Sequence, residues 1–165
     1  MYINVAQLLK EPIGSRRVCQ IEGPVDNEGV SLVKGEVVLI RTNRSILMEG
    51  MLAAEVEGAC SRCVSPASCS VNFRIAEEFF PVVDVLSGSS LPLPDEPGSF
   101  TIDSNHMLDL GEAMRQYILS AMPVKLLCRP DCAGLCPVCG YNLNQGSCQC
   151  FSRLLDRPMV EASPV

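Results

Sequence analysis

Cysteines are the residues of this chain whose spacing most directly indicates chemistry. Six of the ten cysteines fall within residues 128–150, a run that reads CRPDCAGLCPVCGYNLNQGSCQC. Within this run, Cys136 and Cys139 form a Cys-x-x-Cys pair that is followed at once by Gly140. Two thiolates at this spacing turn toward one ion, and the glycine accommodates the tight turn beneath them. The pattern predicts a zinc knuckle, and Cys148 and Cys150 would complete its four-thiolate site.

Four further cysteines predict a second zinc site. Cys60 and Cys63 form another Cys-x-x-Cys pair far upstream, in the sequence CSRC, and two thiolates leave a four-coordinate zinc half satisfied. Cys128 and Cys132 stand just before the knuckle, and we expect them to supply the missing ligands if the C-terminal half folds back. Eight thiolates therefore predict two structural zinc ions.

Spacing alone leaves a different grouping open. The four cysteines of residues 128–139 could share one ion by themselves, which would strand Cys148 and Cys150. Cys19 and Cys69 remain outside either grouping. His106 is the only histidine, and it is a weak candidate for a ligand or a catalyst.

The same cysteines argue against an enzyme. A catalytic zinc keeps an open position, usually beside three protein ligands that include histidine, whereas closed four-thiolate sites are structural. The sequence has no Gly-x-Ser-x-Gly motif and no phosphate-binding glycine-rich loop. We therefore expect no catalysis, no small-molecule substrate and no catalytic residue. The alternative is a thiol-based redox or zinc-responsive regulator, in which oxidation of the knuckle releases metal.

Composition and charge limit the partners and the compartment. The 165 residues carry a net charge of -6 with 47% hydrophobic residues, so the chain lacks the basic footprint of a protein that binds nucleic acid over its whole surface. Scattered basic pairs such as Arg41 and Arg44 are more typical of a solvated face than of a phosphate site. The amino terminus makes a poor signal peptide, and no apolar segment approaches the roughly 18 residues of a membrane span. A cytoplasmic protein without membrane contact is expected, in which thiols bind metal rather than form disulfides.

The elements that must position the cysteines begin with strands. Alternating or β-branched apolar residues predict strands over residues 17–21, 30–41, 46–57 and 71–80, after a short strand or helical turn within residues 3–10. Because the alternation leaves one side of each strand exposed to solvent, antiparallel pairing is favoured. The Cys60–Cys63 pair then lies in the connection between two strands.

Beyond the strands, the sequence predicts an ordered loop and one main helix. Residues 81–100 are rich in Pro, Gly and Ser. Asp109 is a candidate N-cap with Glu112 three residues later, and apolar residues then follow helical spacing until Pro123. We expect an α+β fold in which a small antiparallel sheet or partial barrel is packed by one main helix and followed by a cysteine-rich zinc-knuckle segment. The expected divisions are a β domain over 1–80, a loop over 81–106, and the helix with its zinc-binding tail over 107–165.

These residues carry a resemblance to a known family. The CSRC segment after a strand pair, the stretch Glu77-Glu-Phe-Phe80, the segment from Leu108 to Cys128 and the cysteine run from Cys128 to Cys150 together resemble the YceD family. Members of that family are linked to accumulation of large-subunit ribosomal RNA. The resemblance implies a non-catalytic role in synthesis, processing or stability of 23S ribosomal RNA. The implied partner is the assembling large ribosomal subunit, contacted through a ribosomal protein, ribosomal RNA or both.

Overall fold

The computed structural model describes residues 1–25, 29–95 and 97–150, and its main element is one seven-stranded sheet. The strands are β1 (Tyr2–Asn4), β2 (Arg16–Gly23), β3 (Val30–Arg41), β4 (Ile46–Ala59), β5 (Pro66–Pro81), β6 (Phe100–Ile102) and β7 (Met107–Asp109). The helices are α1 (Ala6–Lys10) and α2 (Gly111–Ala121). No helix within the described residues is both long and apolar enough to span a membrane.

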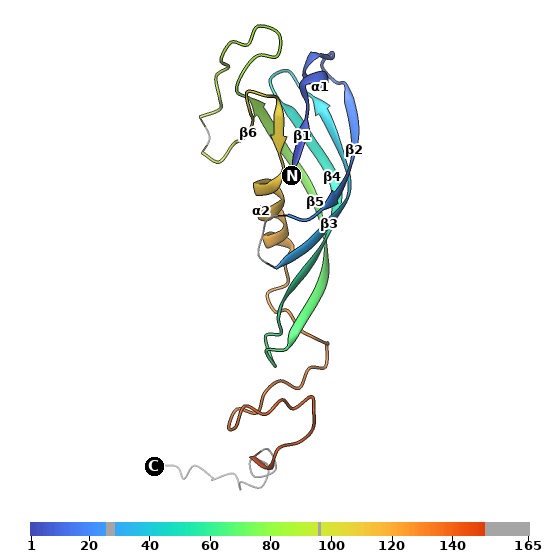
Figure 1. The fold of residues 1–165 in the computed structure, drawn as a ribbon, viewed down its shortest axis with the longest axis vertical. Coiled ribbons are helices and arrows are strands. Elements are labelled where there is room, and N and C mark those ends of the chain that lie inside the picture. Colours follow the sequence, from blue (N-terminus) through green and yellow to red (C-terminus); the bar gives the residue numbers. More distant parts are fainter. Residues whose placement is uncertain (26–28, 96, 151–165) are drawn as a thin grey trace, which may run out of the picture. The chain divides into compact units, whose positions relative to one another are not determined.

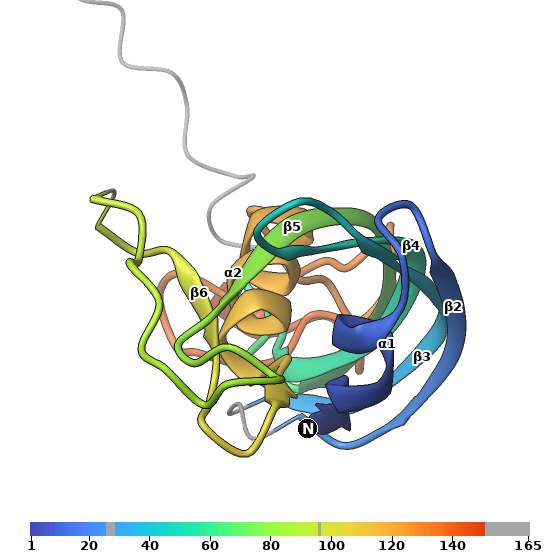
Figure 2. The same cartoon turned by 90° about the horizontal axis from the view of Figure 1, so that it is seen from above.

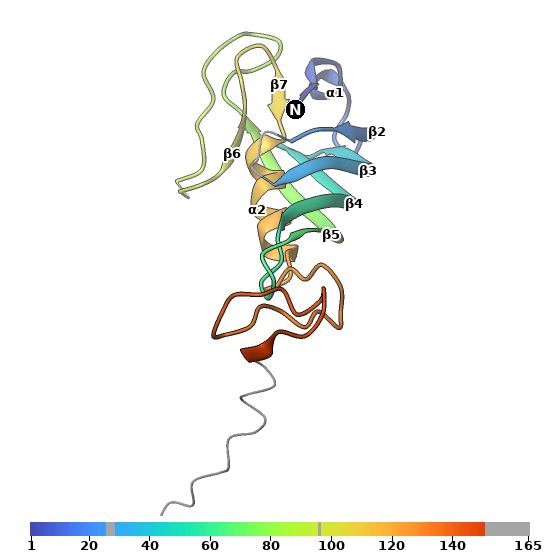
Figure 3. The ribbon, with the colours of Figure 1, turned by 60° about the horizontal axis from the view of Figure 1, so that its bottom comes forward.

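The sheet has the order β1-β7-β6-β5-β4-β3-β2, so the four long strands form a meander on one side (Figure 1). Their mutual arrangement is clearest in Figure 3, where β2 to β5 lie side by side. The pair β5–β6 is parallel, because the chain after Pro81 returns to the level of Phe79 before β6 begins. The expected fold class is confirmed, with β5–β6 as a parallel pair beside the antiparallel pairs β1–β7, β2–β3, β3–β4 and β6–β7.

The core is formed by apolar side chains that alternate with exposed ones along the long strands. On β5, for example, Val71, Phe73 and Ile75 are buried while the residues between them are exposed. The curved sheet wraps around α2 (Figure 2), which buries Met114 and Ile118 completely. Burial of such side chains contributes roughly 1.5–3 kcal/mol each, so the aliphatic core compensates for the scarcity of aromatic residues.

The start of α2 differs from the expected capping box. The helix begins at Gly111 with Leu110 as its N-cap, and no side chain caps it. The Asp109 carboxylate still accepts the Gly111 N–H at 2.9 Å, but from one position further back. Glu112 binds Arg115 at 2.6 Å instead of reaching back to the cap. Residue 109 is held in β7 by pairing with Tyr2, and this long-range pairing overrides the local signal.

The chain forms two compact units. The sheet unit comprises Met1–Glu57 and Cys69–Pro123 and contains the core just described. The cysteine-rich unit comprises Gly58–Ser68, the hairpin tip between β4 and β5, together with the described residues from Val124 to Cys150. The cysteine-rich unit therefore brings together two segments that are about sixty residues apart in sequence.

Candidate metal centre

The two Cys-x-x-Cys loops of the cysteine-rich unit have the same backbone hydrogen bonds. In each loop the first cysteine donates its N–H to the carbonyl five residues later, and its own carbonyl accepts the N–H from four residues later. Its Sγ atom accepts the N–H from two residues later. The three bonds measure 2.8, 2.9 and 3.5 Å in both loops. In the first loop they run from Cys60 to Ser65, from Val64 to Cys60 and from Arg62 to Cys60. In the second loop they run from Cys136 to Tyr141, from Gly140 to Cys136 and from Val138 to Cys136.

Backbone N–H groups favour the ionised form of the first thiol in each loop. The backbone N–H of Cys128, followed by weaker contributions that include the Arg62 N–H, lowers the pKa of Cys60 to about 6. In the second loop the backbone N–H groups of Cys139 and then Val138 lower the pKa of Cys136 to about 7. The thiolate is the form that binds a metal ion. Both loops are therefore arranged to present a ligand.

The residue after the second cysteine adopts a left-handed conformation in both loops. Gly140 has a φ of 72°, which confirms the role predicted for this glycine. The equivalent position in the first loop is Val64, with a φ of 60°. A β-branched residue rarely adopts this conformation, and such backbone strain costs about 1–3 kcal/mol. The loop must be held in place by interactions elsewhere.

We expect the substitution Val64→Gly to stabilise the cysteine-rich unit by about 1 kcal/mol. Glycine relieves the backbone strain of the folded state. It also raises the conformational entropy of the unfolded chain, which offsets part of the stabilisation. The Val64 side chain is 67% exposed, so little buried surface is lost. Urea unfolding of the metal-loaded protein measures the change.

Val124→Gly is the matched control for this substitution. Val124 is fully exposed and has no positive φ, so glycine there only increases chain entropy and destabilises slightly. Equal destabilisation by the two substitutions would show that Val64 is not strained.

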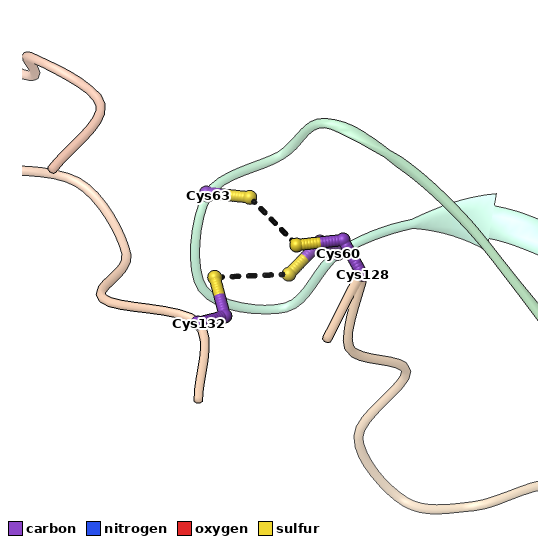
Figure 4. Close-up of side chains that lie close together, drawn as sticks. All are labelled: Cys60, Cys63, Cys128 and Cys132. Atoms are coloured by element: carbon purple, nitrogen blue, oxygen red, sulfur yellow. Dashed lines mark hydrogen bonds between the residues drawn. The ribbon is translucent and has the colours of Figure 1, made fainter. Parts of the chain in front are cut away.

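Four thiols converge on one point in the hairpin cluster, defined as Cys60, Cys63, Cys128 and Cys132. All four Sγ atoms lie within 4.8 Å of one another. Figure 4 shows Cys63 facing Cys128 and Cys60 facing Cys132. The two pairs of Sγ atoms are 3.5 and 3.7 Å apart, respectively. Sulfur atoms bound tetrahedrally to one zinc ion at about 2.3 Å are about 3.8 Å apart, whereas a disulfide is about 2.05 Å long. The donor set and its dimensions fit one metal ion.

Burial in the hairpin cluster is also typical of a structural site. Cys60, Cys63 and Cys132 are 1–5% exposed and pack against Ala67 and Leu127. The contact with the Cys63 thiol raises the pKa of Cys128 to about 12. Four thiols at this distance cannot all be ionised without a cation among them. A bound cation would remove this repulsion.

The knuckle cluster consists of Cys136, Cys139 and Cys148, whose Sγ atoms lie within 4.8 Å of one another. Cys150 joins it through a contact with the Cys139 thiol. Cys128 and Cys132 belong to the other cluster in this geometry, so four thiols converge in the hairpin cluster and three in the knuckle cluster, with Cys150 beside Cys139. Either group could hold a metal ion.

Two residues that support the hairpin cluster were not found from the sequence. The Asn144 side chain donates to Cys132 Sγ at 3.3 Å and accepts the N–H of Ala133 at 2.8 Å. The Arg62 guanidinium donates to the Cys132 carbonyl at 2.8 Å. Such partners orient metal ligands and tune their basicity. Asn144 lies between two cysteine pairs in sequence, but only the folded loop shows which cysteine it reaches.

The remaining candidates lie in the sheet unit. Cys19 is on β2 and Cys69 is on β5, and both pack against the apolar core. His106 precedes β7 with a φ of 60°, and its Nδ1 atom is buried without a hydrogen-bond partner in the described part of the chain. None of the three is part of either thiol cluster.

Comparison with known proteins places both cysteine clusters inside one family match. The family model described as large ribosomal RNA subunit accumulation protein YceD matches residues 48–158. Uncharacterized proteins of Mycobacterium tuberculosis and Mycobacterium bovis are each 32% identical over 101 residues, which cover 61% of this chain and 46% of the relative. A chloroplastic protein of Zea mays, named large ribosomal RNA subunit accumulation protein YCED homolog 1, is 27% identical over 158 residues.

The Zea mays match covers 79% of this chain and 54% of the relative. The chain therefore spans about half the length of the curated relatives it matches. No solved structure gives a significant match.

Proposed function

The chain belongs to the YceD family, and from this premise we propose that it is a non-catalytic cytoplasmic factor that supports accumulation of large-subunit ribosomal RNA. It would act in the synthesis, processing or stability of 23S ribosomal RNA during assembly of the large subunit. Two structural zinc ions would stabilise it. The observation that carries this proposal is the family match over residues 48–158, which contains all eight clustered cysteines.

Zinc is the metal that these donors favour. Sets of four thiolates select zinc or iron, and zinc is the usual occupant of isolated four-cysteine sites with Cys-x-x-Cys spacing. Cys60, Cys63, Cys128 and Cys132 would bind one ion, and Cys136, Cys139, Cys148 and Cys150 would bind the other. Elemental analysis distinguishes zinc from iron directly.

A closed thiolate shell supports a structural role. Four protein ligands leave no coordination position for water or substrate. Metal binding contributes folding free energy on the order of 10 kcal/mol in small zinc domains, which suits a unit with little apolar core of its own. The described core of the cysteine-rich unit consists of three cysteines with Ala67 and Leu127 against them. In this proposal the zinc ions hold a docking surface in shape.

The partner is proposed to be a component of the assembling large subunit, either a ribosomal protein or the RNA. The net charge of -6 suits a basic ribosomal protein, because complementary charge steers association. The contact would then weaken as ionic strength rises.

Depletion of the protein in its source organism tests the function. We expect mature large-subunit ribosomal RNA and the large-subunit peak in sucrose gradients to fall, while small-subunit RNA is maintained. The wild-type gene should restore both. A Cys60→Ser, Cys63→Ser variant should restore neither, because it lacks the hairpin cluster. Northern blots of precursor and mature RNA measure the effect.

Unchanged large-subunit RNA and unchanged subunit profiles after depletion would contradict the proposal. A thiol-based regulator would instead be favoured by two results together: intact RNA after depletion, and loss of zinc from the purified protein on mild peroxide treatment.

A further inference from the structure

A pocket of about 300 Å³ lies in the sheet unit, and no cysteine is among the residues that line it. Its walls come from the end of α1, the β3–β4 turn, the end of β5 and the loop over residues 81–95. Small-molecule pockets span about 300–1,000 Å³, so this pocket suits a small molecule or one unit of a polymer. The 81–95 loop, which the sequence predicted only as a connection, thus forms a wall of a cavity.

Two arginines with unused hydrogen-bond donors line this pocket. Arg41 stands at the end of β3, and Arg44 lies in the turn that follows. Within the described residues, neither guanidinium is hydrogen-bonded or in an ion pair, and Arg41 Nε is buried without a partner. An arginine offers five N–H donors, and a buried donor without a partner is unfavourable. The donors are available to an anion.

The one acidic residue among the lining residues is already engaged. Asp84 Oδ1 accepts hydrogen bonds from the Ser87 N–H at 2.7 Å, the Ser87 hydroxyl at 2.8 Å and the Leu86 N–H at 3.1 Å. These bonds, led by the Ser87 N–H, hold the pKa of Asp84 below its ordinary value, and the positive charge of Arg41 adds a weaker contribution in the same direction. Asp84 makes no ion pair with either arginine within the described residues. Two arginines against one aspartate leave the pocket with one excess positive charge.

Apart from Asn43 in the β3–β4 turn, the remaining walls are apolar and include an aromatic ring. Phe80 is partly exposed at the end of β5 and lines the pocket beside several aliphatic and proline side chains. These residues are Leu9, Pro81, Val83, Val85, Leu91, Pro92 and Pro94. A fully hydrated ion such as inorganic phosphate would not use these walls. An anion attached to a flat, partly apolar body would use both halves of the pocket.

We propose that this pocket binds a nucleoside phosphate, with the phosphate at Arg41 and Arg44 and the nucleoside against Phe80. Arginine binds phosphate oxygens in bidentate fashion, and aromatic side chains stack on bases without strong sequence preference. The basic pair that resembled a solvated face in the sequence is here the charged end of a cavity. The ligand has two sources, a free nucleotide or one nucleotide of a single-stranded RNA. The assignment does not depend on a role in ribosomal RNA accumulation.

Titration of the full-length, zinc-loaded protein with uridine and adenosine 5′-monophosphate tests the assignment. Isothermal calorimetry gives the affinity, and NMR identifies the signals of the Phe80 ring that shift. Inorganic phosphate and the unphosphorylated nucleosides are titrated in parallel. A fluorescently labelled single-stranded RNA, with competition by the free nucleotides, distinguishes the two sources.

We expect the nucleotides to bind more tightly than phosphate or nucleoside alone and to shift the Phe80 signals. Arg44→Gln should weaken binding about tenfold or more, because charge-assisted hydrogen bonds are lost. Arg44 is exposed, so this variant should fold, and Arg41→Gln should show the same loss. Arg74→Gln is the matched control, because Arg74 is an exposed arginine on β5 that lies outside the pocket. It should leave the affinity unchanged.

Three results would overturn the assignment. The first is no nucleotide binding at millimolar concentration, and the second is equal binding of inorganic phosphate and nucleotide. The third is an equal loss of affinity in Arg74→Gln and Arg44→Gln, which would indicate diffuse attraction rather than a pocket. If labelled RNA binds and free nucleotides compete at the Phe80 signals, the ligand is an RNA nucleotide. If only the free nucleotides bind, it is a small molecule.

Discussion

Serine at both Cys60 and Cys63 is expected to lower the zinc content from two ions to one per chain and to unfold most of the cysteine-rich unit. The two substitutions remove half of the hairpin cluster, and Cys128 and Cys132 alone leave zinc with two protein ligands. The segment Gly58–Ser68 is joined to the chain after Val124 by this cluster and by a few hydrogen bonds, such as Leu135 N–H to the Arg62 carbonyl at 3.1 Å.

The expected loss of stability in this variant is large. Structural zinc contributes folding free energy on the order of 10 kcal/mol in small zinc domains, whereas a hydrogen bond contributes about 0.5–1.5 kcal/mol. A few hydrogen bonds therefore cannot replace the ion. The sheet unit has its own apolar core and should stay folded. Elemental analysis gives the zinc count, and limited proteolysis with mass spectrometry locates the newly accessible bonds.

Cys19→Ser with Cys69→Ser is the matched control, because it also removes two thiols but neither belongs to a cluster. It should keep two zinc ions and the proteolysis pattern of the wild type. Two zinc ions in the Cys60, Cys63 variant would contradict the hairpin cluster as a metal site. One zinc ion with an unchanged proteolysis pattern would show that the ion is bound but is not needed for folding.

Sequence periodicity predicted the four long strands, because the alternation of buried and exposed side chains is visible within each strand. Each strand alternates between the core and solvent, as Val71, Phe73 and Ile75 do on β5. The short strands β6 and β7 were not predicted, since three residues carry no periodicity and their pairing partners are distant in sequence. The start of α2 was mispredicted for the same reason, because Asp109 belongs to β7 and pairs with Tyr2, which is distant in sequence.

The cysteine loops could be predicted for a related reason. A Cys-x-x-Cys pair with a following glycine is a local geometry, and Gly140 adopts the left-handed conformation that the motif requires. The sequence did not show that Val64 occupies the position equivalent to Gly140, because valine rarely adopts a left-handed conformation. Asn144 and the Arg41–Arg44 pocket depend on contacts between distant segments, so the types of these residues gave no indication of their positions.

Serine at Cys136 and Cys139 is also expected to leave one zinc ion, and this variant discriminates between the two ligand groupings. In the grouping we propose, only the knuckle cluster is lost. Cys60, Cys63, Cys128 and Cys132 keep an ion, so the Gly58–Ser68 tip stays protected from proteolysis. If residues 128–139 formed one site instead, the same variant would destroy it.

A second double variant, Cys128→Ser with Cys132→Ser, completes the test of the two ligand groupings. In our grouping it removes the hairpin ion, retains the knuckle ion and exposes the Gly58–Ser68 tip, as the Cys60, Cys63 variant does. Cobalt substitution gives an independent readout, because each four-thiolate site contributes its own thiolate-to-metal absorption, and each double variant should lose about half of it. If the Cys136, Cys139 and Cys128, Cys132 variants instead lost the same ion, residues 128–139 would share one site. Two sites of four, each joining thiols that are distant in sequence, predict different losses for these variants.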